Sequence, residues 1–345
     1  MTSQYSSYHE GELAVQSRAG VGSDGLAADA MYRAVMPTGV QRFLLAQQLA
    51  VFSTRDADDL VWASMRSGQP SFLRPLDERT LEIGGYSHVD DPLLANLGAH
   101  AEAGMIVIYL EARHRVRLNG TARAHSDGRI VLTIQQLYGN CPQYIQARSV
   151  IGDREISTGR ARFGKELDRR QYHSVEQADT LFIATVHPHS GADASHRGGR
   201  PGFVCVESEK RLLFPDYRGN NMFNTLGNIV SNPRTGLLFP DFQSGGALQL
   251  SGSARILWDD PRMKRFEGAQ RLVEFDIERV IDLPEATRLR FEFQSYWPAL
   301  PGEPRAATSE FHSCDAQSVL HLLQIVLHLV EPVNALLEMT RQAGK

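Results

Sequence analysis

Cysteine is scarce in this sequence of 345 residues. The three that occur, Cys141, Cys205 and Cys314, are far apart and odd in number. Such a pattern gives no disulfide framework. A reducing compartment, the cytoplasm, is therefore the simplest location to expect for the protein.

A long hydrophobic run is also missing. The longest apolar stretch, residues 319–330, is interrupted by His321, Gln324 and His328, and it is shorter than the about 20 residues that span a bilayer. The first residues contain neither a basic run nor an apolar core, so they predict no signal peptide. We expect no membrane contact.

An excess of one charge is the third absence. There are 36 Lys and Arg against 40 Asp and Glu, a net charge of −4, which argues against a nucleic-acid partner. The sequence has neither a G-x-S-x-G elbow nor a P-loop, so hydrolase and kinase functions have little support. Its 42% hydrophobic and 22% charged residues are typical of a soluble globular protein.

The sequence does contain a pattern that is written twice. The segment 64–73, SMRSGQPSFL, returns 131 residues later (195 − 64) as 195–204, SHRGGRPGFV. Further pairs at offsets of 131 or 132 residues are Leu81 and Leu212, Tyr86 and Tyr217, Gly104–Val107 and Gly236–Phe239, and Val116–Arg123 and Leu248–Arg255. We interpret the chain as two copies of one unit.

Each copy shows the same order of short strands with one helix after the third strand. In the second copy the patterns predict strands at 181–185, 201–206, 211–214, 236–239 and 248–255, and a helix at 222–230. Regularly spaced short strands with turn signals predict a small closed β-barrel. The predicted domains are a partly helical segment 1–45, barrels at 46–150 and 171–300, a linker 151–170, and a helical tail 301–345.

The sequence resembles a known family in three places. These are Asn232–Phe239, the Leu-x-Leu-x-Gly-x-Ala-Arg pattern of Leu248–Arg255, and the run NCPQYI at 140–145 with Arg148. Together they resemble the FMN-binding split-barrel superfamily, and within it the group related to pyridoxamine 5'-phosphate oxidase. The resemblance implies a fold that is mainly β with α, made of two tandem split barrels with helical N- and C-terminal segments. It also implies FMN bound between two barrels, which usually come from two subunits. A tandem chain could supply both barrels, and a homodimer is also expected of some such chains.

Differences between the copies indicate which one holds the cofactor. The second copy has Arg197 and Arg200 where the first has Arg66 and Gln69. Before its helix it has Asn220 and Asn221, where the first copy has two aspartates. Arginine and amide donors favour a phosphate and carboxylates repel it. We therefore predict the FMN phosphate in the second barrel, and a degenerate first barrel. Surface salt bridges for the arginines and helix capping for the asparagines are the structural alternatives.

Other residues complete the predicted cofactor site. Pro215, Asp216 and Tyr217 lie on the edge that would face the flavin ring, although Asp216 is equally well a turn residue. Tyr144 and Arg148 could reach across from the first barrel, or form a structural hydrogen bond. His196 is the candidate catalytic residue, as a donor to a flavin carbonyl or as an acid–base group. The predicted site comprises His196, Arg197, Arg200, Pro215, Asp216, Tyr217, Asn220, Asn221, Tyr144 and Arg148.

The run His187-Pro188-His189, with Asp193 and His196 nearby, has two interpretations. A metal site is one, but no cluster of Cys or Glu completes a ligand set. We prefer a mobile loop beside the flavin and assign no metal site.

The leading hypothesis is an FMN-dependent oxidoreductase acting on a small organic molecule. One alternative is an enzyme of the same fold that uses deazaflavin or haem. Another is a non-catalytic flavin-binding or sensing module whose tail helices dock a partner. The sequence leaves these alternatives open.

Overall fold

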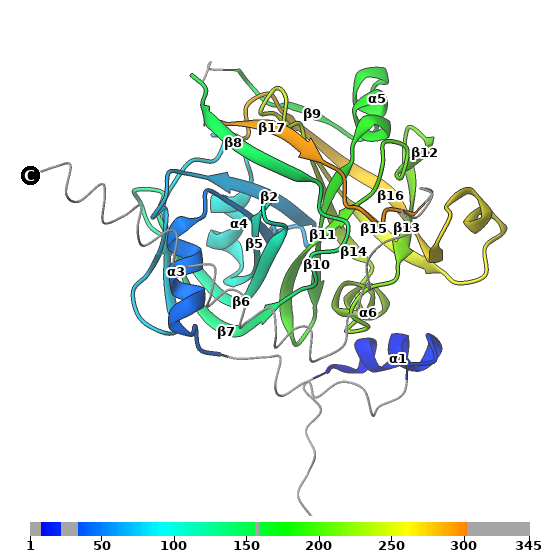
Figure 1. Cartoon of the computed structure of the whole chain (residues 1–345), viewed down its shortest axis with the longest axis horizontal. Coiled ribbons are helices and arrows are strands. Elements are labelled where there is room, and N and C mark those ends of the chain that lie inside the picture. The colour runs from blue at the N-terminus through cyan, green and yellow to red at the C-terminus, as the bar shows by residue number, and fades with distance from the viewer. Residues whose placement is uncertain (1–7, 22–33, 156–158, 302–345) are drawn as a thin grey trace, which may run out of the picture.

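The computed structural model describes residues 8–21, 34–155 and 159–301. The helical tail predicted for 301–345 therefore lies outside the described residues, apart from its first position. Within the described part the protein is mainly β with few helices, as predicted (Figure 1). The described residues include no helix long and apolar enough to cross a membrane.

The helices are short and the strands more numerous. The helices are α1 (Glu10–Arg18), α3 (Thr38–Ala46), α4 (Leu93–Ala99), α5 (Arg169–Gln177), α6 (Asn224–Ser231) and the 3-10 helix η2 (Pro261–Arg265). The strands of the first half are β1 (Leu49–Arg55), β2 (Val61–Ser67), β3 (Leu73–Pro75), β4 (Thr80–Ile83), β5 (Glu102–Tyr109), β6 (His114–Ala124), β7 (Ile130–Gly139) and β8 (Ala147–Asp153). Those of the second half are β9 (Arg162–Gly164), β10 (Thr180–His187), β11 (Gly191–Gly198), β12 (Cys205–Ser208), β13 (Arg211–Tyr217), β14 (Arg234–Pro240), β15 (Ala247–Leu257), β16 (Ala269–Leu283) and β17 (Leu289–Ser295).

The two large sheets have the same antiparallel strand order. The first is β2-β1-β5-β6-β7-β4-β3 and the second β11-β10-β14-β15-β16-β13-β12. Each strand of the first sheet thus has a counterpart at the same place in the second. A third sheet joins the halves, because β8 pairs with β17. The segment predicted as a linker, 151–170, contains the end of β8 and also β9, which pairs with β16.

The prediction of closed barrels is wrong, because neither sheet closes on itself through strand pairing. In the first sheet the end strands β2 and β3 are not paired with each other, and β3 has only three residues that could form such a pairing. A single bridge between Ser67 and Tyr86 crosses the open side. Arg66 also crosses it by donating to the carbonyl oxygens of Gly84 and Gly128 at 2.5 and 2.6 Å. Side-chain hydrogen bonds therefore replace a continuous ladder there.

One strand was missed by the sequence patterns. Residues 187–196 suggested a loop, yet Gly191–Gly198 form β11, which pairs with β10 along its whole length. Ala192 and Ala194 are buried in the core between the halves. Asp193 and Ser195, on the opposite face of β11, bind a side chain from the first half. Its polar residues are thus buried by hydrogen bonding across the molecule and not exposed as in a loop.

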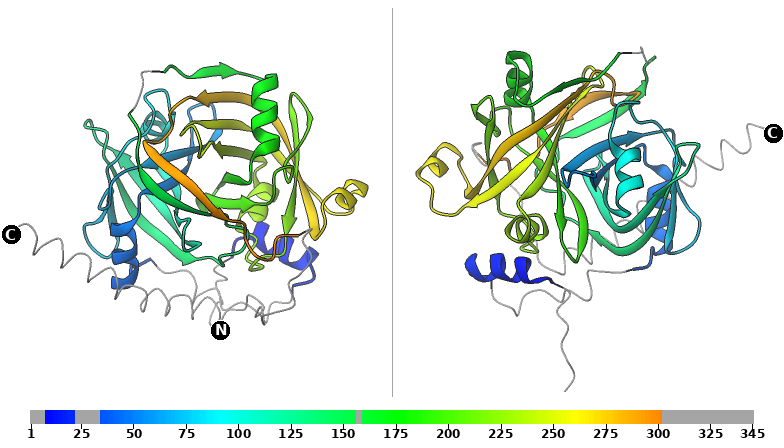
Figure 2. Two further views of the ribbon diagram at one scale, coloured as in Figure 1. Left: turned by 45° about the horizontal axis from the view of Figure 1, so that its top comes forward. Right: turned by 180° about the vertical axis from the view of Figure 1, so that it is seen from behind.

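The halves pack closely through two equivalent glycines. A Cβ at Gly104 of β5 would lie 2.6 Å from the Ala192 carbonyl oxygen, and a Cβ at Gly236 of β14 would lie 2.6 Å from that of Val61. Any larger residue would push the strands apart. The blue-to-cyan first half and the green-to-orange second half lie side by side in every view (Figure 2). Among the described residues, each half has a large hydrophobic core of its own, and a further large core lies between the halves.

The N-terminal helix α1 packs on α6 of the second half (Figure 1). Its close approach depends on Gly11 and Gly227, since a Cβ at Gly227 would lie 2.6 Å from the Glu12 nitrogen. The Glu12 carboxylate also accepts from the Asn224 amide. The Gln16 amide donates to the Met222 carbonyl oxygen at 3.3 Å. α1 is therefore attached to the beginning of α6 as well as to its middle.

Candidate functional site

A cavity lies between the two halves. Strand β6 and the segment after β7 contribute from the first half, and β11, β13 and the start of α6 from the second. Its lining residues are Arg115, Arg117, Asn140, Cys141, Gln143, Tyr144, His196, Arg197, Gly198, Phe203, Pro215, Asp216, Tyr217, Gly219, Asn220, Asn221, Phe223, Asn224, Thr225 and Leu226.

Most of the predicted site residues come together in this cavity. Those that line it are His196, Arg197, Pro215, Asp216, Tyr217, Asn220, Asn221 and Tyr144. Arg200 and Arg148 do not line it. The Arg200 guanidinium lies 4.5 Å above the ring of Tyr296, and Arg148 donates to Asp179 at 2.6 Å. Arg197 on β11 therefore lines the cavity, whereas Arg200, in the turn after β11, does not.

Arg115 and Arg117 of the first half also line the cavity, although the sequence did not predict them. Arg117 donates to Asp193 at 2.9 Å and to the Ser195 hydroxyl at 2.6 Å. Burial opposes the charged form of Arg117, but the Asp193 carboxylate and the Tyr138 hydroxyl together outweigh burial and raise the pKa of Arg117. The residue 132 positions later is Gln249, which contacts the Ser64 hydroxyl at 3.3 Å. The comparison of copies at this pair could have found Arg117.

His196 is buried at the side of the cavity, with 3% of its surface exposed. Its Nδ1 lies 3.1 Å from Nη1 of Arg115. Its Nε2 is buried without a hydrogen-bond partner among the described residues. Burial, and then the positive charge of nearby arginines, lower the pKa of His196 well below its usual value. The imidazole is therefore neutral at physiological pH.

Asp216 lies between two arginines. Arg197 is 3.6 Å from one carboxylate oxygen and Arg271 is 3.5 Å from the other. Burial raises the pKa of the Asp216 carboxyl, and the two guanidinium groups oppose that rise. Arg197 therefore shares its charge with a carboxylate already present in the cavity. Beside it, the rings of Tyr144 and Tyr217 stack at 5.3 Å.

The beginning of α6 forms another wall. The helix starts at Asn224, two residues later than predicted, because Asn221 and Phe223 have positive φ. No side chain caps it. The Asn220 side chain instead contacts Met222, with its oxygen accepting from the Met222 nitrogen at 3.2 Å. The main-chain N–H groups of Thr225 and Leu226 in the first turn, which have no carbonyl partner inside a helix, can thus bind an anion in the cavity.

The cavity wall also contains buried polar atoms that find no partner among the described residues. Four such atoms are His196 Nε2, Arg117 Nε, Asn140 Oδ1 and Gln143 Oε1. Two of the four are donors and two are acceptors. Buried polar groups are normally satisfied. A ligand with both acceptors and donors on its edge would satisfy them, and the ring of FMN has such an edge.

The equivalent positions of the first half are occupied by internal contacts. Arg66, the counterpart of Arg197, donates to main-chain carbonyl oxygens. Gln69, the counterpart of Arg200, donates to Asp153. Asp91, before α4, accepts from Gln249 at 2.8 Å, and burial raises its pKa to about 6. A carboxylate and an internally bound arginine make a poor phosphate site there.

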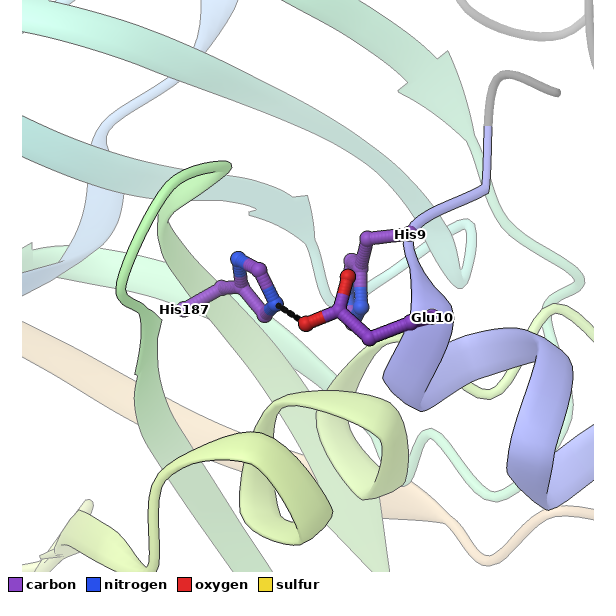
Figure 3. A group of neighbouring side chains, drawn as sticks. All are labelled: His9, Glu10 and His187. Carbon is purple, nitrogen blue, oxygen red and sulfur yellow. Dashed lines mark hydrogen bonds and ion pairs between the residues drawn. The ribbon is translucent and has the colours of Figure 1, made fainter. Parts of the chain in front are cut away.

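The histidines at 187 and 189 do not lie beside this cavity. Residues 188–190 form the turn between β10 and β11, so the predicted mobile loop at the flavin is wrong. His187 instead meets His9 and Glu10 at the start of α1 (Figure 3). Its Nε2 lies 3.0 Å from the Glu10 carboxylate, and the two imidazole rings lie 4.0 Å apart.

His9, Glu10 and His187 are residue types that bind metals, but the ring nitrogens of the two histidines carry their protons in the wrong positions for a metal. Nδ1 of His187 accepts from the main-chain nitrogens of His189 and Ser190 at 3.1 and 3.0 Å. Nδ1 of His9 accepts in the same way from Gly11 at 3.2 Å. A neutral imidazole that accepts at Nδ1 has its proton on Nε2 and no lone pair there for a metal. The group instead attaches α1 to the β10–β11 hairpin.

The described residues are mainly β with few helices, as the sequence resemblance implied. Residues 169–297 match the model of the pyridoxamine 5'-phosphate oxidase family. This match, which covers less than half of the chain, confirms the resemblance that the sequence motifs indicated. No curated protein matches the chain.

Several solved structures are similar to about a third of the chain. HupZ from Group A Streptococcus is 13% identical, with 35% of this chain and 98% of HupZ covered and a TM-score of 0.29. A Clostridium acetobutylicum protein related to general stress protein 26 of B. subtilis is 13% identical, with coverages of 35% and 89% and a TM-score of 0.25. An FAD-binding protein from Mesorhizobium loti is 14% identical, with coverages of 35% and 96% and a TM-score of 0.25. The resemblance to the pyridoxamine 5'-phosphate oxidase family rests on the family model and not on these structures.

Proposed function

We propose that this chain is an FMN-binding flavoprotein that acts as an oxidoreductase on a small organic molecule. The observation that carries the proposal is the set of unpartnered buried donors and acceptors in a cavity that arginines and an uncapped helix also line. FMN needs both kinds of contact, because it joins an anionic phosphate to a planar heterocycle. Bound FMN would supply the redox chemistry, while the protein orients it and sets its electrostatic environment.

The proposed phosphate position keeps the start of the helix that the sequence indicated but loses Arg200. The phosphate would bind at the first turn of α6, with Arg197 as the nearby cation. The side chains of Asn220 and Asn221 remain in the cavity wall, but Asn220 is engaged with Met222. The heterocycle would then bind His196 and Arg117 as donors, and Asn140 and Gln143 as acceptors.

We also propose that the halves are tandem copies and that only the second retains a cofactor site. The identical strand order and the equivalent glycines Gly104 and Gly236 support this history. The internal contacts of Arg66 and Asp91 support the loss of the first site. Cytoplasmic location and homodimer formation are further expectations, which fractionation and gel filtration would test.

Two arginines of β11 and the turn after it provide a matched test. We expect Arg197→Met to weaken FMN binding about tenfold or more, since a charge-assisted contact to phosphate contributes about 1.5–3 kcal/mol. Arg200→Met, which removes a cation outside the cavity, should leave the Kd unchanged. Fluorescence titration of apoprotein with FMN measures both, and thermal melts show whether either variant is misfolded. Equal losses in the two variants would contradict the proposed site.

The absorbance spectrum of the purified protein separates the alternatives. Flavin bands would support FMN, and a Soret band would indicate haem. A spectrum that matches free deazaflavin would indicate that cofactor. Turnover with oxygen or a nicotinamide donor would distinguish an enzyme from a non-catalytic binding or sensing module. A colourless protein that fails to bind added FMN would contradict the leading proposal.

A further inference from the structure

The ring of His196 is held in place by a residue from the other half of the molecule. Arg115 of β6 lies with Nη1 3.1 Å from His196 Nδ1. A guanidinium has five N–H donors and no acceptor. The contact is therefore a hydrogen bond from Arg115 to the lone pair of Nδ1. The single ring proton of the neutral imidazole must then be on Nε2.

The Nε2 atom has no partner of its own. It is buried, and no described residue accepts a hydrogen bond from it, while His196 lines the cavity. Phe182 packs against the ring edge-on, with centroids 5.6 Å apart, which leaves the ring little freedom to turn. A fixed and buried N–H without an acceptor is expected to have one in the functional state.

The charges around the ring oppose a second proton. The groups that lower the pKa of His196, after burial itself, are Arg115, Arg197, Arg148 and Arg117. An imidazolium would also turn Nδ1 into a donor facing the N–H groups of Arg115. Both geometry and charge thus keep His196 neutral with one tautomer.

We propose that Arg115 fixes His196 as a permanent hydrogen-bond donor to an acceptor atom of the bound heterocycle, and that His196 takes up no proton during the reaction. The acceptor is a ring carbonyl oxygen or an unprotonated ring nitrogen. The identity of the heterocycle as FMN rests on the proposed function, whereas the tautomer of His196 does not. Arg115 is a positioning residue, because it acts through His196.

The tautomer can be tested in the full-length apoprotein. Long-range 1H–15N spectra of protein labelled at histidine give the protonation of each ring nitrogen, and the signals missing from His196→Gln identify His196. We expect an unprotonated Nδ1 and a protonated Nε2, without titration, from about pH 5 to about pH 8. An imidazolium pattern near neutral pH, or a proton on Nδ1, would overturn the proposal. In Arg115→Met the fixed tautomer of His196 should be lost. An unchanged spectrum would show that Arg115 does not fix the tautomer.

The donor role is tested with two substitutions. His196→Gln keeps an N–H near the position of Nε2, and His196→Leu removes it. We expect the Kd for FMN to rise about tenfold with Leu and by no more than about threefold with Gln. Equal effects of the two variants, or no effect of either, would overturn the donor role. If the wild-type chain binds no FMN, the proposed function fails, while the spectra still decide the tautomer.

Discussion

At the scale of single residues, Arg117 is the clearest link between the halves. Its position in the first half is matched by Gln249 in the second, and both contact a serine of the opposite half. Both also contact a carboxylate of the opposite half, Asp193 and Asp91 respectively, but only Arg117 forms an ion pair with it. A buried ion pair of this kind is sensitive to the loss of one partner, because the other charge remains buried.

We therefore expect Arg117→Gln to lower the free energy of unfolding by about 3 kcal/mol. The double variant Arg117→Gln with Asp193→Asn should recover most of that loss, since no charge is then left unpaired. Urea unfolding of the wild type, both single variants and the double variant measures the coupling. Additive losses would mean that the pair contributes no interaction of its own.

At the scale of elements, α1 and α6 are joined at the place where α6 borders the cavity. A Cβ at Gly227 would lie 2.6 Å from the Glu12 nitrogen, so Gly227→Ala should displace α1 and shift the first turn of α6. We expect a lower melting temperature and weaker FMN binding, although alanine is the better helix former. Gly98→Ala in α4 is the control, because nothing lies within 4 Å of its added Cβ. Similar behaviour of the two variants would show that α1 does not support the site.

The elements also show what the sequence could predict. The spacing of the repeat predicted most strands and their order, because short alternating patterns and turn residues act locally. It did not predict β11, whose Asp193 and Ser195 are polar like a loop but are buried by Arg117 from another sheet. It did not predict Arg115 or Arg117 in the site for the same reason. Their roles depend on contacts with residues far away in the chain, which only the packing of the halves creates.

At the scale of the whole molecule, the packing of the halves depends on Gly104 and Gly236. A Cβ at Gly104 would lie 2.6 Å from both the Ala192 oxygen and the Asp193 Cα. Gly104→Ala should separate β5 from β11, lower stability by about 1–3 kcal/mol as overpacking does, and weaken FMN binding. Gly139→Ala, at the end of β7 with nothing within 4 Å of its Cβ, should do neither. Thermal unfolding and FMN titration compare them.

The two halves are held together by the pairing of β8 with β17 and by the close contact of Gly104 with β11. This has a consequence for how the protein behaves on dilution. A site shared by two subunits disappears when the subunits dissociate, so its affinity falls with protein concentration. Here both walls of the cavity belong to one polypeptide, and the effective concentration of one half at the other is fixed by the chain. FMN affinity should therefore be the same at nanomolar and micromolar protein. In the cell, even a few copies of the chain would each have a complete site.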